Sequence, residues 1–126
     1  MGLDLYLAME IFKEFTFEAA HHLPNMPEGH PCGRLHGHSW KAVIYLKDEI
    51  KQPYGWVMDF GDIAKKFEPI REQLDHNYLN NIEGLENPTS EVIAKWVWDK
   101  LKPELEALSR VTIYETVDCA ATYTGE

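Results

Sequence analysis

The residues of this chain best suited to chemistry are one cysteine and three histidines. Cys32, His36 and His38 lie within seven residues of one another, and His21 lies upstream. If residues 36–47 form a strand, His36 and His38 point to the same face, because side chains alternate along a strand. Two imidazoles on that face and a third from a neighbouring strand would form a three-nitrogen zinc site. Such a site leaves a fourth position open, as catalytic zinc sites do.

The third imidazole is predicted to come from a strand over residues 11–21. Apolar and polar residues alternate there, so His21 shares the apolar face with Phe15 and Phe17, whereas His22 falls on the other face. His21 is therefore the better ligand candidate, although a slip or bulge at the strand end would reverse the choice. Zinc is favoured over iron because no carboxylate completes the set. The alternative is a cluster of structural histidines.

Cys32 has three interpretations. It lies in a loop over residues 23–35 that is interrupted by Gly and Pro. As a fourth metal ligand it would close the site and make the metal structural. As a thiol near a cation it could act as a nucleophile or base. It could also be a bystander, and the residues alone favour ligand and base equally.

Asp75 and His76 follow directly on a helix predicted over residues 62–74. A carboxylate beside an imidazole can orient it as an acid–base pair. Alternatively, His76 is an ordinary cationic side chain that interacts favourably with the C-terminus of the helix. Taken alone, the Asp75–His76 pair slightly favours this second interpretation.

Glu115 lies between Ile113 and Val117 on the predicted apolar face of a strand over residues 110–117. A buried carboxylate is costly unless it is paired or hydrogen-bonded. The ordinary explanations are a frayed strand end or a salt bridge at the core edge. The functional alternative is that Glu115 binds a ligand with several N–H donors, such as an amino-pyrimidinone edge. A carboxylate can accept two hydrogen bonds from such an edge in a bidentate way.

The remaining pattern predicts two helices between two pairs of strands. The helix over 62–74 contains Pro69, where it could kink or break. A second helix begins near Asn87, the cap candidate, with Pro88 at the first helical position. A strand over 119–124 completes the order ββααββ, which predicts an α+β domain with an antiparallel sheet and two helices on one face. The open sheet edges predict a homo-oligomer.

Length and composition limit the classes of function. With 126 residues, a single domain over residues 1–126 is expected, in which 1–10 are an extension or the start of the first strand. A net charge of −9 argues against a nucleic-acid surface and against binding to anionic membranes. No apolar run is long enough to span a membrane. Two cysteines and no visible signal peptide predict a cytoplasmic protein without disulfides.

Six segments between about Phe12 and Glu126 together resemble a known enzyme family. They are FTFEAAHHL, EGHPCGRLHGHSW, GWVMDFGDI, LDHNYLN, GLENPTSEVIAKWVW and ETVDCAATY. The family is that of 6-pyruvoyl-tetrahydropterin synthase. The short spacing between the cysteine and the HGH motif resembles the carboxy-forming members, which act in queuosine biosynthesis, since the pyruvoyl-forming members typically have a longer gap.

The resemblance implies a role for each candidate residue. The histidines that bind zinc in the family correspond to His21, His36 and His38. The groups that transfer protons correspond to Cys32, Asp75 and His76. The glutamate that anchors the pterin ring in the family corresponds to Glu115, and Thr89 and Ser90 contribute to the pterin pocket.

The resemblance also implies the fold and the reaction. The fold is the tunnelling fold, in which the sheets of several subunits join into a barrel with active sites between subunits, usually as a hexamer of two trimers. The substrate is 7,8-dihydroneopterin triphosphate, and the products are 6-carboxy-5,6,7,8-tetrahydropterin, acetaldehyde and triphosphate. A pyruvoyl-forming enzyme and a non-catalytic zinc- or pterin-binding protein are the alternatives. The sequence does not choose among Lys13, Arg34 and Lys41 as the residue that contacts the triphosphate.

Overall fold

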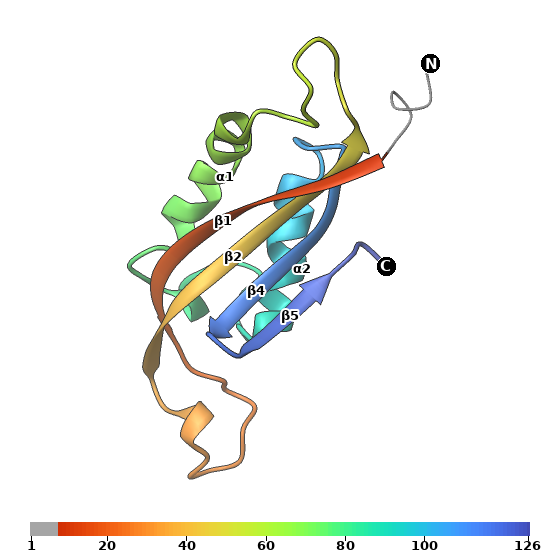
Figure 1. Cartoon of the computed structure of the whole chain (residues 1–126). Helices are drawn as coiled ribbons and strands as arrows, with labels where there is room; N and C mark the ends of the chain where they lie inside the picture. The colour runs from red at the N-terminus through yellow and green to blue at the C-terminus, as the bar shows by residue number, and fades with distance from the viewer. Residues whose placement is uncertain (1–7) are drawn as a thin grey trace.

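The computed structural model describes residues 8–126, which form one sheet and two α-helices (Figure 1). The strands are β1 (Ala8–His21), β2 (His36–Glu49), β3 (Asn77–Tyr78), β4 (Leu108–Thr116) and β5 (Cys119–Tyr123). The helices are α1 (Phe60–Leu74) and α2 (Ser90–Leu101), with short 3-10 turns η2 (Pro31–Gly33) and η3 (Leu79–Asn81). The α+β class and the ββααββ order of the long elements are confirmed. Of the predicted N-terminal segment, residues 8–10 belong to β1 and residues 1–7 lie outside the described part.

The strand order in the sheet is β3-β1-β2-β4-β5. The four long strands pair antiparallel, as predicted, and β1 pairs with β2 along its whole length, from Ala8 opposite Glu49 to His21 opposite His36. The two-residue β3 was not predicted, and it runs parallel to β1. It is too short for an alternating pattern to reveal it.

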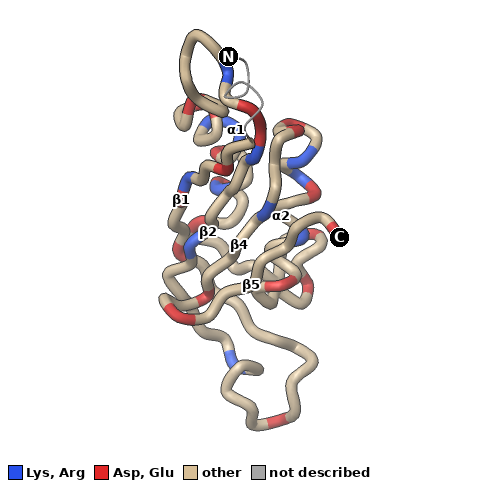
Figure 2. Tube along the Cα trace, turned by 45° about the vertical axis from the view of Figure 1, so that its right-hand side comes forward, with Lys and Arg blue, Asp and Glu red and all other residues tan. Residues whose placement is uncertain are grey.

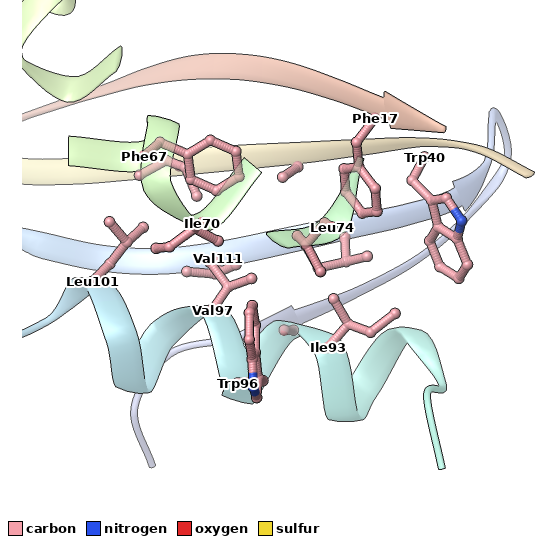
Figure 3. Close-up of a cluster of buried hydrophobic side chains, with 14 of the residues drawn as sticks. Phe17, Trp40, Phe67, Ile70, Leu74, Ile93, Trp96, Val97, Leu101 and Val111 are labelled. Carbon is pink, nitrogen blue, oxygen red and sulfur yellow. The ribbon is translucent and has the colours of Figure 1, made fainter. Parts of the chain in front are cut away.

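Both helices lie on the same face of the sheet and bury it (Figure 1). Figure 3 shows side chains from α1 and α2 meeting those of the strands in one layer. Phe17 and Trp40 stack with ring centroids 5.9 Å apart, and Phe67 of α1 is fully buried. Full burial of a large apolar side chain stabilises the fold by about 1.5–3 kcal/mol. This layer holds the ends of β1 and β2 in place.

Helix α1 begins two residues earlier than predicted and is not broken. The Asp59 carboxylate caps it by accepting the N–H of Gly61 at 2.8 Å. The helix continues through Pro69 to Leu74. The missing N–H of proline costs one helical hydrogen bond, and the four buried apolar residues of α1 offset this loss: Ile63, Phe67, Ile70 and Leu74.

Helix α2 begins at Ser90, so the predicted cap at Asn87 is wrong. The cap is Thr89, whose hydroxyl accepts the N–H of Val92 at 3.1 Å. Threonine is a good cap because its oxygen satisfies one of the free N–H groups of the first turn. Pro88 consequently precedes the helix. Neither helix in residues 8–126 is long and apolar enough to cross a membrane.

Strand β4 ends at Thr116, and the prediction that Val117 lies on its apolar face is wrong. Val117 is 97% exposed, because it lies in the turn that leads to Cys119 of β5. The pairing register shifts between Tyr114 and Thr116, which leaves Glu115 in a β-bulge. Bulges change the direction of the side chain that they contain.

Candidate active site

The three histidines that the sequence singles out gather where β1 ends and β2 begins. His21 and His36 are register partners, and His38 lies two residues further on the same face. One ring nitrogen from each residue lies within 4.8 Å of the others. His21 is only 1% exposed. The structure thus brings together a cluster of imidazoles that could hold a metal ion.

The hydrogen bonds of the cluster define the tautomer of two rings. Nδ1 of His21 lies 2.8 Å from the carbonyl oxygen of Pro88, and Nδ1 of His36 lies 2.7 Å from that of Arg34. A carbonyl only accepts, so both Nδ1 atoms donate and each Nε2 keeps a lone pair. These two Nε2 atoms are 3.1 Å apart. Nε2 of His38 is buried and has no hydrogen-bond partner within residues 8–126.

This arrangement fits a metal ion. Two facing lone pairs repel, and a cation between them removes the repulsion. Tetrahedral zinc with bonds of about 2.05 Å would separate its nitrogen ligands by about 3.3 Å. Burial lowers the pKa of His21 and of His38, and repulsion from His36 adds to both effects. The neutral imidazole that results is the form that binds metals. The two carbonyls orient the rings as outer partners of metal ligands do.

Glu115 points at the same cluster. Its carboxylate oxygens lie 3.9 Å from Nε2 of His21 and from Nε2 of His38. That distance is too long for a hydrogen bond. The side chain of Glu115 is 31% exposed, so it is half-buried rather than buried as the sequence predicts. Its neighbours are imidazoles and not a lysine or arginine at the core edge, and its carboxylate keeps acceptor capacity for a ligand.

Cys32 shares a cavity with His36, one member of the cluster. Its loop is held by both of its backbone groups: its N–H donates to Nδ1 of His30 at 3.0 Å, and its carbonyl accepts the N–H of Leu23 at 2.8 Å. The group of metal-ligating atoms in the described residues does not include this thiol. Cys32 lines a cavity of about 330 Å³ together with Arg34 and His36.

Asp75 and His76 do meet. The Asp75 carboxylate lies 3.1 Å from Nδ1 of His76 and also accepts the N–H of Glu18 at 2.8 Å. The Glu18 N–H, followed by His76, lowers the pKa of Asp75. His76 has a left-handed backbone (φ 58°), its side chain is 79% exposed, and it lines a groove of about 580 Å³ with His38. Cys32 and His76 thus line different cavities.

The start of α2 contacts the cluster through its backbone. Thr89 uses its hydroxyl oxygen as the cap, and Ser90 is the first helical residue. The preceding residue, Pro88, supplies the carbonyl that orients His21. The sequence contained no signal for this contact, because every residue type carries a carbonyl.

His22 lies outside the cluster. Its ring stacks on Tyr78, whose hydroxyl is hydrogen-bonded to Nδ1 of His22. Its N–H and carbonyl bond to the side chain of Asn80. The strand alternation therefore separates the neighbours His21 and His22 as predicted.

Several known proteins are similar to this chain in sequence and in fold. Residues 10–126 match the family model described as 6-pyruvoyl tetrahydropterin synthase. The chain belongs to this family. It is 45% identical over 119 residues to the 6-carboxy-5,6,7,8-tetrahydropterin synthase of Synechocystis sp., covering 90% of this chain and 91% of that protein. It is 33% identical to human 6-pyruvoyl tetrahydrobiopterin synthase, covering 81% and 70% of the two chains.

A solved structure supports the fold directly. The 6-pyruvoyl tetrahydropterin synthase of Caenorhabditis elegans superposes with a TM-score of 0.88 at 26% identity, covering 96% of this chain and 98% of that chain. The predicted tunnelling fold of the chain is confirmed.

Proposed function

We propose that the protein is a 6-carboxy-5,6,7,8-tetrahydropterin synthase of queuosine biosynthesis. It is a lyase that converts 7,8-dihydroneopterin triphosphate and one water molecule into 6-carboxy-5,6,7,8-tetrahydropterin, acetaldehyde and triphosphate. The observation that carries this proposal is the 45% identity to a carboxy-forming synthase over 90% of the chain. The histidine cluster and the thiol of Cys32, which lines a cavity with His36, provide groups that suit the chemistry.

We further propose that the metal is zinc. His21, His36 and His38 would hold it, and an all-imidazole, neutral set of ligands suits this ion. When bound, zinc supplies a Lewis acid that polarises a substrate oxygen. The carbonyls of Pro88 and Arg34 keep two of the rings oriented toward it.

The proton transfers are assigned to Cys32 and to the Asp75–His76 pair. The thiol removes and returns protons at the substrate side chain, and the Asp75 carboxylate holds His76 as its partner in proton transfer. Because Cys32 and His76 line different cavities, and because the His76 side chain is 79% exposed, the two groups would meet across a subunit boundary. This supports active sites between subunits in a hexamer built from two trimers.

Binding of the pterin ring is assigned to Glu115, with contributions from Thr89 and Ser90. A carboxylate accepts the two N–H groups of an amino-pyrimidinone edge in a bidentate way. Glu115 has no hydrogen bond within the described residues that would compete with such a ligand, and it lies 3.9 Å from two cluster histidines. The pterin would therefore bind with its side chain close to the cluster.

We also propose that residues 1–126 form one domain and that the protein acts in the cytoplasm. One sheet and its two helices account for residues 8–126. Cys32 and Cys119 are both free thiols, which suits a reducing compartment.

Product analysis tests the proposed reaction. The purified, zinc-loaded protein is incubated with dihydroneopterin triphosphate, and the products are identified by mass spectrometry. Release of acetaldehyde with the 6-carboxy product is expected. A pyruvoyl product without acetaldehyde would instead support the second candidate, pyruvoyl synthase, which the human relative favours. Pterin binding without any product would identify a non-catalytic binding protein.

A further inference from the structure

We propose that Arg34 binds the phosphate chain of the substrate. This inference rests on the proposed function, because that function supplies a substrate with a triphosphate. The chain carries a net charge of −9, so a triphosphate needs a local cation to bind. The question is which basic residue lies close enough to the reacting groups and is free to serve.

Lys41 and Lys13 are less suited to this role. Lys41 lies three residues along β2 from His38, about 10 Å at the rise of an antiparallel strand, and the odd spacing places its side chain on the opposite face of the sheet. Its Nζ is also 3.4 Å from the Glu14 carboxylate and lies over the ring of Tyr114.

Lys13 is further away still. It lies eight residues before His21 on β1, about 27 Å away by the same rise. Its Nζ lies over the ring of Phe15. Within one subunit, neither lysine is therefore placed as well as a residue of the Cys32 loop to contact a phosphate beside the thiol.

Arg34 lies next to the reacting groups. It is two residues before His36, so their Cα atoms are at most about 7.6 Å apart. It also lines the same cavity of about 330 Å³ as Cys32 and His36. Its carbonyl accepts from His36, which holds the backbone while the side chain extends from it.

The guanidinium of Arg34 is available. Within residues 8–126, the ion pairs of arginine involve Arg71 with Asp75 and Arg110 with Glu10, and none involves Arg34. The only acidic residue in the loop between β1 and β2 is Glu28. Figure 2 shows the basic and the acidic position of this loop well separated from each other.

The proposed chemistry requires a cation at this place. Elimination of triphosphate removes a proton from the carbon next to the one that carries the phosphate. The phosphate must therefore lie near the thiol that takes this proton. A guanidinium binds phosphate oxygens in a bidentate way and stabilises the charge that develops on the leaving group.

Inorganic tripolyphosphate is the probe for this site. Its inhibition constant and its calorimetric affinity are measured on the full-length, zinc-loaded protein and on the variants Arg34→Gln, Arg34→Lys and Lys41→Gln. We expect Arg34→Gln to weaken tripolyphosphate binding by about tenfold or more, the effect of losing one charged hydrogen bond. Arg34→Lys should restore part of the affinity, and Lys41→Gln should leave it within a factor of about two, as for a screened surface charge. Zinc content should not change.

The outcomes separate this inference from the proposed reaction. Equal tripolyphosphate binding by Arg34→Gln and the unchanged protein would overturn the role of Arg34, while product analysis would still decide the reaction. Loss of zinc in Arg34→Gln would also overturn it, because Arg34 would then support His36 and not the phosphate. If the unchanged protein forms no carboxy product but Arg34→Gln still loses tripolyphosphate, the phosphate contact stands and the assigned reaction fails.

Discussion

Nε2 of His21 and Nε2 of His36 face each other at 3.1 Å, while Nδ1 of each ring is hydrogen-bonded to a backbone carbonyl. Neither ring can turn its donor toward the other without losing its carbonyl partner. The contact between the two lone pairs is unfavourable, and a cation between them converts it into a favourable one.

The first prediction concerns metal content. His36→Ala should lower the affinity for zinc by at least about tenfold and therefore reduce the zinc retained after dialysis, since loss even of an outer partner of a metal ligand costs 10–100-fold in affinity. His22→Ala is the matched control, because His22 adjoins the cluster in sequence but bonds to Tyr78 and Asn80 instead. Elemental analysis of the purified variants measures this effect. Full zinc occupancy of His36→Ala would exclude His36 as a ligand.

Metal removal should also lower thermal stability. A ligand that binds only the folded state stabilises it in proportion to its affinity. A chelator should therefore lower the Tm of the unchanged protein and leave that of His36→Ala nearly constant. Differential scanning calorimetry with and without chelator gives the comparison.

The second prediction separates the two roles of Cys32. Cys32→Ala should lower kcat by about 10²–10⁴-fold, the usual contribution of a general acid–base group, and retain zinc. Cys119→Ala, which changes an exposed thiol in β5, should have normal turnover. If Cys32→Ala loses zinc as well as activity, the thiol is a metal ligand and the proposed mechanism is wrong.

The third prediction concerns the cap of α2. Thr89→Ala should lower the free energy of unfolding by about 1 kcal/mol, because the N–H of Val92 loses its acceptor. For a chain of this length, the corresponding decrease in Tm is about 3–5 °C. Thr89→Ser keeps the oxygen and should remain close to the unchanged protein. Equal Tm values for the alanine and serine variants would contradict the capping role.

The fourth prediction is a pH dependence of stability. Because the Glu18 N–H and His76 lower the pKa of Asp75 in the folded protein, its ionised form stabilises the fold at pH values above the unfolded pKa of about 3.9. This contribution is lost as the pH falls below that value. Asp75→Asn should therefore be less stable than the unchanged protein at pH 7, with a difference that shrinks below about pH 4.

Urea denaturation at pH 7, 5 and 3.5 measures this dependence. Glu72→Gln, an exposed change on the same helix, is the control. A difference between Asp75→Asn and the unchanged protein that stays constant with pH would show that the charge of Asp75 does not contribute.

Strand alternation was sufficient to select the histidines of the cluster. It separated His21 from His22 because the core fixes which face of β1 is buried, and a slip by one residue would expose that face. It also identified Glu115 as an unusual residue on an apolar face. The physical basis in each case is side-chain polarity that repeats with the period of a strand.

The contacts that the sequence did not reveal involve the backbone. The carbonyls of Pro88 and Arg34 orient the histidines, yet any residue type supplies a carbonyl. The bulge at Glu115 arises from a shift in strand pairing, which alternation within β4 does not encode. The cap at Thr89 was missed because Asn87, two residues earlier, is an equally good capping residue type.

Glu18 is bonded to the end of α1 through its main chain: its N–H donates to Asp75, and its carbonyl accepts the N–H of His76 at 2.6 Å. His21 lies three residues further along β1. The number of residues in segment 18–21 and in segment 74–77 therefore determines how far apart the histidine cluster and His76 lie. Inserting or deleting a single residue between Leu74 and Asn77 would shift that spacing, so the length of this connection is constrained as well as the two side chains that it carries, Asp75 and His76.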